Sequence, residues 1–469
     1  MAARRPSRGR SPPTPGSPTW SAPARSARSP PGTTASRSTR PVCSPRRPTT
    51  TGSRAVPTSR RSAGPGPPPR SAARPSGCGS GSCRAPTGRP ATSAPTATWP
   101  TPTSTSSSTS ATTCTSTSRA STPTATSSRT SASTTRKRET ITLRDYRRRH
   151  AQYKTDPDLQ ALHATVPFVV TWDDHEVADG WWPGGAFEHQ PDEGSWDSRR
   201  RAALKAYDEW MPVRISGTAR PGDGTRIYRS LRFGDLADLT MLDLRGYRDE
   251  RVDVGSAALT DARRSITGRP QGEWLVEQLT TSTARWKLVG NPVMIAPMLM
   301  PQRPQAEQIA LQHTTDPMAW GPAEPNTDTW DGYPEERRAL LETIAEQDVQ
   351  DVVFLSGDVH TAWANEVRLD DRPVATELVC ASITSNNVDD FMGTPPRTVS
   401  RSIESAVRTL NPHVRFVNLD DHGFSVVELD RDRARLEWHA VSDRRDPDAT
   451  SRLLAAREVR SGSARLLPA

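Results

Sequence analysis

The sequence predicts an α/β fold over residues 137–469, and three observations support this prediction. Four short apolar runs have the composition of strands that are buried on both faces of a sheet. Helical stretches separate several of these runs, and the C-terminal part alternates apolar and polar residues as half-buried strands do. The predicted buried strands are 166–172, 238–244, 286–290 and 351–355.

Residues 1–136 are a different kind of sequence. They contain no Asp, Glu, Lys, His, Asn, Gln, Leu, Ile, Phe or Tyr, and consist mainly of Ser, Thr, Pro, Ala, Arg and Gly. We expect this segment to be disordered, because it cannot bury enough apolar surface to offset the entropy of ordering. Its 20 arginines also explain the formal net charge of +9, since the rest of the chain has 42 basic and 53 acidic residues, a net −11. No basic stripe for nucleic acid remains in 137–469.

The composition of residues 1–136 is typical of a GC-rich gene translated out of frame. Apart from Met1, Val42 and Val56, every residue has a codon with C or G in the middle, as expected when third bases are read as middle bases. In the shifted frame, residues 102–116 are compatible with Asp-Leu-Asp-Leu-Val-Val-His-Leu-Gly-Asp-Tyr-Met-Tyr-Glu, and the stretch around 82–87 allows Ser-Cys-Ala-Asn. The alternative is a genuine disordered tail whose arginines contact nucleic acid.

The remaining elements follow from periodicity and punctuation. The predicted helices are 142–164, 198–210, 271–281 and 334–347. Pro157 is expected to break or open the first helix, and Pro334 lies in the first turn of the last. The predicted half-buried strands are 375–381, 424–429 and 434–440. No apolar run reaches the roughly 18 residues of a membrane span. Only Cys380 lies outside residues 1–136, so neither a disulfide framework nor a zinc–cysteine site is indicated.

Polar side chains follow all four predicted buried strands. The first strand leads into Asp173-Asp174-His175, the second into Arg245, the third into Asn291, and the fourth into Asp358 and His360. Open α/β sheets place their sites at the carboxyl ends of the strands. Asp, Asn and His side chains that converge there would suit hard or borderline cations.

Each of these residues alone has an ordinary structural explanation. An isolated Asp173–Asp174 pair is most often a turn or a helix cap, and a lone His360 after a strand is more often a hydrogen-bonded structural histidine. Arg245 with its neighbours Arg248 and Asp249 is also typical of a surface ion-pair cluster. The joint occurrence of Asp–His elements at two strand ends favours a metal site.

Six segments together resemble the PhoD-like alkaline phosphatase family of the calcineurin-like metallophosphoesterase superfamily. They are TWDDHEVADGWW, LDLRGYRD, WKLVGNPVMIAP, WDGYPEERRALL, FLSGDVHTAW and NPHVRFVNLDDHGF, and the resemblance covers essentially all of 137–469. It implies a sandwich of two mixed β-sheets flanked by helices, and an enzyme that acts on phosphate esters. It also implies a small β-sandwich followed by Ser-Cys-Ala-Asn-like and Gly-Asp-Tyr segments, and the shifted frame recovers both segments.

The resemblance further implies a dinuclear site with iron(III) and calcium, other divalent metals being possible, in which an activated water attacks the phosphate ester. The implied metal ligands are Asp174, Asn291, Asp358 and His360. Of these, Asp174 lies on the calcium side and His360 on the iron side. His175 is implied to stabilise the transition state or protonate the leaving oxygen. Arg245 is implied to grip the phosphate, where a planar bidentate donor is useful.

The chain departs from the family in its first motif, because the Cys, the bridging Asp and the Tyr ligand are absent from the translated frame. Residues 137–469 would therefore be the metallophosphatase domain without its first strand or strands, and we expect this chain to be inactive or badly folded. The alternatives are a phospholipase D-like phosphodiesterase and a non-enzymatic protein with a nucleic-acid-binding tail. The resemblance implies a secreted or cell-envelope protein. The family is commonly exported by the twin-arginine route, and Arg4-Arg5 suits that route, although no apolar signal core follows the pair.

Overall fold

The computed structural model describes residues 104–105, 139–213, 226–302 and 323–469. Its centre is a seven-stranded sheet of order β11-β9-β10-β8-β5-β4-β3. The strands are β3 (Arg229–Phe233), β4 (Ala237–Met241), β5 (Trp286–Asn291), β8 (Val352–Ser356), β9 (Ala362–Leu369), β10 (Arg372–Val379) and β11 (Val414–Asn418). β4, β5, β8 and β10 are parallel, while β3, β9 and β11 are antiparallel to their neighbours. The predicted disorder of residues 1–136 lies outside the described residues, apart from 104–105.

A second sheet packs face to face against the first. It consists of β12 (Gly423–Leu429), β13 (Arg433–Val441), β14 (Ser451–Arg460) and β15 (Leu466–Pro468), all antiparallel. Leu239, Trp286 and Leu378 of the first sheet share one buried cluster with Leu436 and Trp438 of the second. The predicted α/β sandwich is therefore confirmed, with one mixed sheet and one antiparallel sheet in place of two mixed sheets.

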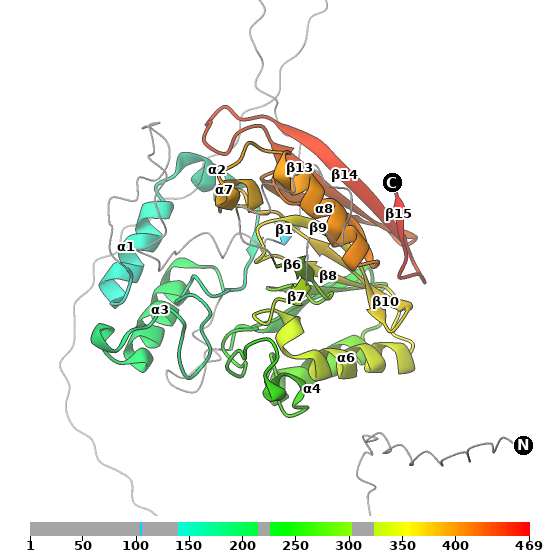
Figure 1. Cartoon of the computed structure of the whole chain (residues 1–469), viewed down its shortest axis with the longest axis horizontal. Coiled ribbons are helices and arrows are strands. Elements are labelled where there is room, and N and C mark those ends of the chain that lie inside the picture. Colours follow the sequence, from blue (N-terminus) through cyan, green and yellow to red (C-terminus); the bar gives the residue numbers. More distant parts are fainter. Residues whose placement is uncertain (1–103, 106–138, 214–225, 303–322) are drawn as a thin grey trace, which may run out of the picture. The chain divides into compact units, whose positions relative to one another are not determined.

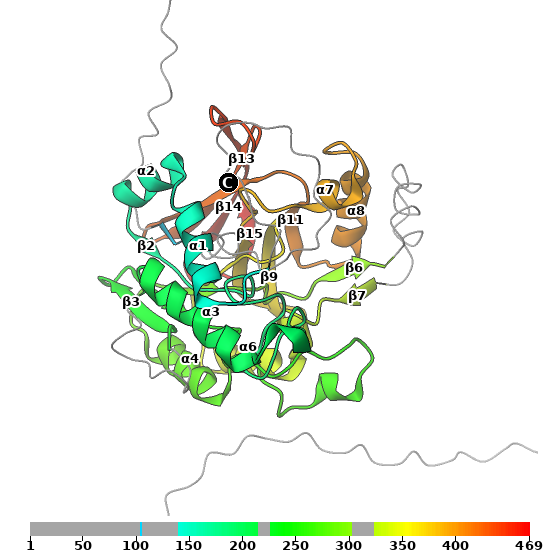
Figure 2. The ribbon, with the colours of Figure 1, turned by 90° about the vertical axis from the view of Figure 1, so that its left-hand side faces the viewer.

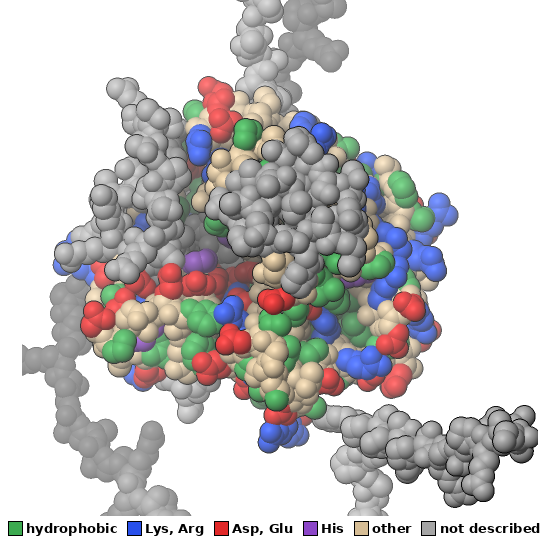
Figure 3. Space-filling view, in the orientation of Figure 1, with side chains coloured by type: hydrophobic (Ala, Val, Ile, Leu, Met, Phe, Trp, Pro, Cys, Tyr) green, Lys and Arg blue, Asp and Glu red, His purple; other side chains and the backbone are tan. Residues whose placement is uncertain are grey.

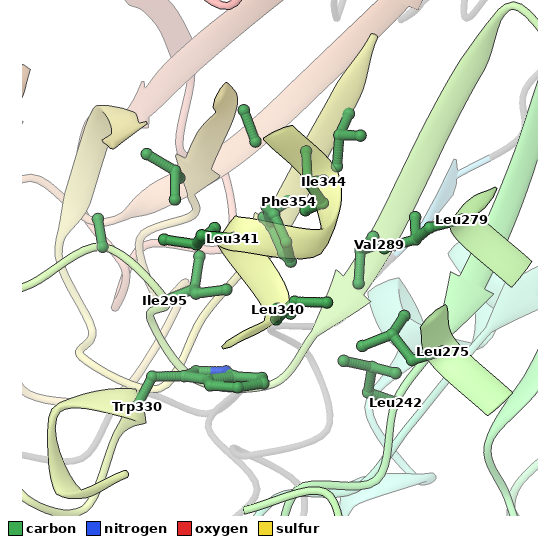
Figure 4. Packing of buried hydrophobic residues seen from close by; sticks show 14 of the residues in the cluster. Leu242, Leu275, Leu279, Val289, Ile295, Trp330, Leu340, Leu341, Ile344 and Phe354 are labelled. Atoms are coloured by element: carbon green, nitrogen blue, oxygen red, sulfur yellow. The ribbon is translucent and has the colours of Figure 1, made fainter. Parts of the chain in front are cut away.

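Two helices cover the other face of the large sheet, as Figures 1 and 2 show. They are α4 (Arg269–Thr281) and α6 (Pro334–Glu346), and each has Pro in its first turn, where the missing N–H costs nothing. Leu275 and Leu279 of α4 lie four residues apart on one face. Together with α6 they pack on Val289 and Phe354 of the sheet (Figure 4).

The remaining elements surround this sandwich. The other helices are α1 (Leu143–Tyr153), α2 (Pro157–Thr165), α3 (Trp196–Trp210), α7 (Val388–Met392) and α8 (Val399–Leu410), with 3-10 turns at Pro191–Glu193, Ala257–Thr260 and Trp330–Gly332 (η5). β6 (Leu299–Pro301) and β7 (Ala323–Pro325) form a hairpin-like pair. The predicted helix 142–164 is two helices, because Asp156 caps α2 by accepting from the Leu159 N–H at 2.8 Å. None of the helices in the described part of the chain has the length and apolar character needed to cross a membrane.

The predicted strand 166–172 is much shorter in the structure. Only β2 (Phe168–Val169) forms, and it pairs in parallel with the two residues of β1 (Ser104–Thr105). Beyond β2, side-chain hydrogen bonds hold the chain beside the end of β4. Thr171 donates to the Leu242 carbonyl at 2.7 Å, and Trp172 Nε1 donates to Asp243 at 2.8 Å. These bonds bring the segment after β2 to the carboxyl end of β4, as the sequence predicts.

Truncation of Phe354 to Ala should destabilise the fold strongly, because this ring is 0% exposed in the core beneath α6. We expect a loss of about 3–5 kcal/mol in the free energy of unfolding. Urea denaturation followed by tryptophan fluorescence measures it. Phe391→Ala is the matched control, since Phe391 is 65% exposed and should change stability by no more than about 0.5 kcal/mol. Equal effects of the two substitutions would contradict this packing.

Candidate active site

The ends of the first and last predicted buried strands meet in an acidic group. Ligand atoms of Asp173, Asp174 and Asp358 all lie within 4.8 Å of one another, and so do those of Asp174, His175 and Asp179. Asp173 and Asp174 follow β2, and Asp358 follows β8. Figure 3 shows acidic side chains gathered beside a histidine on one face of the molecule. The convergence predicted from sequence is thus present for Asp174, His175 and Asp358.

Asp174 is fixed by a tight loop. Its Oδ1 accepts from the His175 N–H at 2.9 Å, and its Oδ2 accepts from the Gly180 N–H at 3.1 Å. Gly180 has φ +64°, a conformation that side chains rarely adopt. The loop is anchored by Trp181, which is fully buried and donates from Nε1 to the Asp173 carbonyl at 3.0 Å. Trp181 therefore packs the base of the site.

The Arg245 guanidinium lies among the carboxylates and is 0% exposed. Its Nε is 2.5 Å from Asp173, its Nη1 is 2.7 Å from Asp328, and its Nη2 is 3.3 Å from Asp358. Asp328 also accepts from Arg248 at 2.9 Å. This is an ion-pair cluster, but a buried one that links separate segments of the chain.

The pKa values in this cluster respond to burial and to the neighbouring charges. Burial raises the pKa of Asp358 well above its ordinary value, and the charge of Asp173 adds to the effect. Burial also opposes ionisation of Asp174, but His175 and Arg245 together lower its pKa. The same pairing with Asp174 raises the pKa of His175. The cluster therefore attracts additional positive charge, either as protons or as cations.

His360 is oriented by a backbone carbonyl. Its Nδ1 lies 2.8 Å from the Asn386 oxygen. A carbonyl can only accept, so Nδ1 carries the proton and Nε2 keeps its lone pair when the ring is neutral. Burial lowers the pKa of His360, which favours the neutral ring. Asp358 and His360 have φ of +72° and +57°, so the turn that presents them is strained.

Two predicted site residues have other partners in the structure. Asn291 is 0% exposed, its Oδ1 accepts from Trp330 Nε1 at 3.0 Å, and its amide donates to the Val293 carbonyl and to Ser356. Its oxygen therefore has the Trp330 indole as one partner and keeps a second lone pair for a further bond. Nε, Nη1 and Nη2 of Arg245 each have a carboxylate partner. The ligand role of Asn291 and the phosphate role of Arg245 stay predictions.

Sequence reasoning missed two acidic residues of the site. Asp179 shares the tight loop with Asp174, and burial together with the charge of Asp174 raises its pKa to about 6. Asp328 bridges the two arginines from the loop before η5. Neither residue directly follows one of the four predicted buried strands, so the strand-end pattern could not find them. The only sequence signal for Asp179 is its place just before Gly180 in the same loop.

The donor set fits a cation in chemical terms. Asp173 Oδ2 is buried and has no hydrogen-bond partner among the described residues. Carboxylates with an imidazole nearby suit hard or borderline metal ions. The residues present therefore fit a metal at the group formed by Asp173, Asp174 and Asp358.

Three comparisons point in one direction. A family model described as PhoD-like phosphatase matches residues 115–438. Alkaline phosphatase D of Bacillus subtilis (strain 168) is 34% identical over 296 residues, which cover 60% of this chain and 45% of that protein. A solved structure of PhoD is similar with a TM-score of 0.59 and 29% identity, covering 71% of this chain and 60% of that one. The chain thus spans less than half the length of the curated relative that it matches.

Replacing Arg245 by Met should destabilise the protein by about 3–5 kcal/mol, because buried carboxylates lose their cation. The pKa of Asp358, already raised by burial, should rise further, and a raised folded-state pKa means that stability is lost as pH increases through it. The deficit should therefore grow with rising pH in urea denaturation series. Arg263→Met removes an exposed ion pair with Asp261 and should change little at any pH. A deficit that shrinks as pH rises would contradict this assignment.

Proposed function

The chain belongs to the PhoD-like phosphatase family, and on that premise we propose that its acidic site hydrolyses phosphate esters with bound metal. The observation that carries the proposal is the convergence of Asp173, Asp174 and Asp358 within 4.8 Å. The second group overlaps the first at Asp174, and the carboxylates of Asp174 and Asp179 beside those of Asp173 and Asp358 suit two cations side by side, with His175 left for proton transfer. Iron(III) and calcium, implied by the sequence resemblance, are our proposal for these two cations.

The chain's own residues would divide the work. Asp174, Asp358 and His360 hold the metals, and His360 offers Nε2 because Nδ1 is bonded to a carbonyl. The chemistry that bound metal supplies is polarisation of the phosphoryl oxygens and a lowered pKa for the attacking water. His175, with its pKa raised by Asp174, is suited to protonate the leaving oxygen. Arg245 keeps Asp173 and Asp358 in place, and we propose that it also grips the phosphate.

We further propose that residues 1–136 arise from out-of-frame translation and that this chain is impaired for that reason. Residues 104–105 pair in parallel with β2, the strand that leads into Asp173. The shifted frame fills 102–116 with a strand that ends in Gly-Asp-Tyr. We infer that a carboxylate encoded there would complete the acidic group, whereas the translated sequence 106–116 contains only Ser, Thr, Ala and Cys.

The two alternative functions are less well supported. A nucleic-acid-binding tail depends on residues 1–136 alone, whereas the family match extends over 115–438. A phospholipase D-like diesterase would use the same site, and substrate comparison separates it from a monoesterase.

The coding sequence tests the reading frame directly. Translated in all three forward frames across the first 420 or so bases, which code for about 140 residues, it should show an open frame that carries Gly-Asp-Tyr near codons 110–113. Stop codons scattered through both alternative frames would contradict the frameshift hypothesis and favour a genuine disordered tail.

Phosphatase assays test the activity. We expect the chain as written to hydrolyse p-nitrophenyl phosphate and bis(p-nitrophenyl) phosphate poorly with iron and calcium present, and a frame-restored version to be at least about 100-fold faster, since even outer-shell losses cost 10–100-fold. Asp174→Asn should abolish the gain, and Asp261→Asn at an exposed ion pair should not. Equal, measurable rates for the chain as written and the frame-restored chain would contradict the proposal that this chain is impaired. Inactivity of both would contradict the proposal that the site hydrolyses phosphate esters.

A further inference from the structure

The carbonyl that orients His360 belongs to a loop between β10 and α7, residues 380–387. We propose that Arg444, in the connection between β13 and β14, is a positioning residue that fixes this loop and thereby the tautomer and direction of His360. The proposal rests on the proposed function only in taking His360 as a metal ligand. The contacts themselves are independent of metal.

Arg444 contacts the loop at Thr384 and Asn386, and the helix α7 that follows it at Asp390. Its Nη1 donates to the Thr384 carbonyl at 2.9 Å. Its Nη2 donates to Asn386 Oδ1 at 3.0 Å and to Asp390 Oδ1 at 2.8 Å. The Arg444 side chain is only 12% exposed, so little water competes for these acceptors. The planar Arg444 guanidinium thus binds the side chain of Asn386, the residue whose backbone carbonyl accepts from His360.

The three successive carbonyls of this loop each have a separate side-chain partner. The Thr384 carbonyl accepts from Arg444, the Ser385 carbonyl lies 2.9 Å from His422 Nε2, and the Asn386 carbonyl accepts from His360. The turn is closed from inside by Ser382 Oγ, which accepts from the Ser385 N–H at 2.9 Å. The direction of the Asn386 carbonyl is therefore set by the loop as a whole, and Arg444 is the side chain that touches the loop most often.

The chemistry explains why an arginine stands here. A lysine has one ammonium and cannot reach carbonyl, amide and carboxylate oxygens with fixed geometry, whereas a guanidinium can. Partners behind a metal-binding histidine fix its tautomer and ring orientation, and their loss commonly costs 10–100-fold in metal affinity. Through Arg444, the small antiparallel sheet contributes to a site that is otherwise built on the large sheet.

The test follows the histidine directly. In the full chain with ¹⁵N-labelled histidine, His360 is one of 9 histidines and is identified by the signal lost in His360→Gln. We expect wild type to show protonation at Nδ1 only. Arg444→Gln should give a mixture of tautomers at His360, and Arg445→Gln, at the exposed neighbouring arginine, should not. Circular dichroism checks that each variant is folded.

Two further measurements make the outcome decisive. Asn386→Ala removes one acceptor of Arg444 but keeps the backbone carbonyl. It should therefore shift the tautomer of His360 in the same direction as Arg444→Gln, to a smaller extent. It replaces Arg444→Gln if that variant does not fold. Titration with manganese(II) alone should show affinity falling about 10–100-fold in Arg444→Gln relative to Arg445→Gln. An unchanged His360 tautomer in the folded variants would overturn the positioning role. A shifted tautomer without manganese binding in any variant would support the positioning role, and the same titration on the frame-restored chain would then decide whether the proposed metal function fails.

Discussion

The position of Arg245 is the constraint on which the site depends. Its guanidinium joins the segment after β2, the loop before η5 and the turn after β8 to the end of β4. Burying a charge without a partner costs several kcal/mol, so these segments are held together by the requirement that their carboxylates share one cation. The same requirement leaves the acidic group with more negative than positive charge, which is the electrostatic condition for binding metal.

Much of the fold could be predicted from apolar runs, and the exceptions have physical reasons. β4, β5 and β8 are buried on both faces and consist mostly of apolar residues. β9 escaped prediction because buried Asn365 and Glu366 interrupt its apolar pattern. The Asn365 amide N–H donates to Glu377 and Glu366 accepts from Arg415, contacts that only the tertiary structure reveals. The strand at 166–172 was overpredicted, since only Phe168 and Val169 of it pair as a strand, and Thr171 and Trp172 contact the end of β4 through their side chains.

The candidate site was predictable where chemistry coincides with strand ends. Asp174, Asp358 and His360 follow predicted strands and lie where the topology of a parallel sheet places them. Asn291 follows a strand too, but its oxygen accepts from Trp330, and no local pattern records a bond across 39 residues. The residue proposed to position the loop behind His360 lies still further along the chain, since Arg444 is in the connection between two strands of the second sheet.

The left-handed backbone at Asp358 and His360 has a consequence for how this turn responds to mutation. Glycine adopts such conformations freely, so replacing either residue by glycine would relax the turn while deleting a site group. Selection for stability alone would favour that exchange, and selection for function would oppose it. The turn is therefore a place where libraries screened for thermal tolerance would tend to lose the chemistry first.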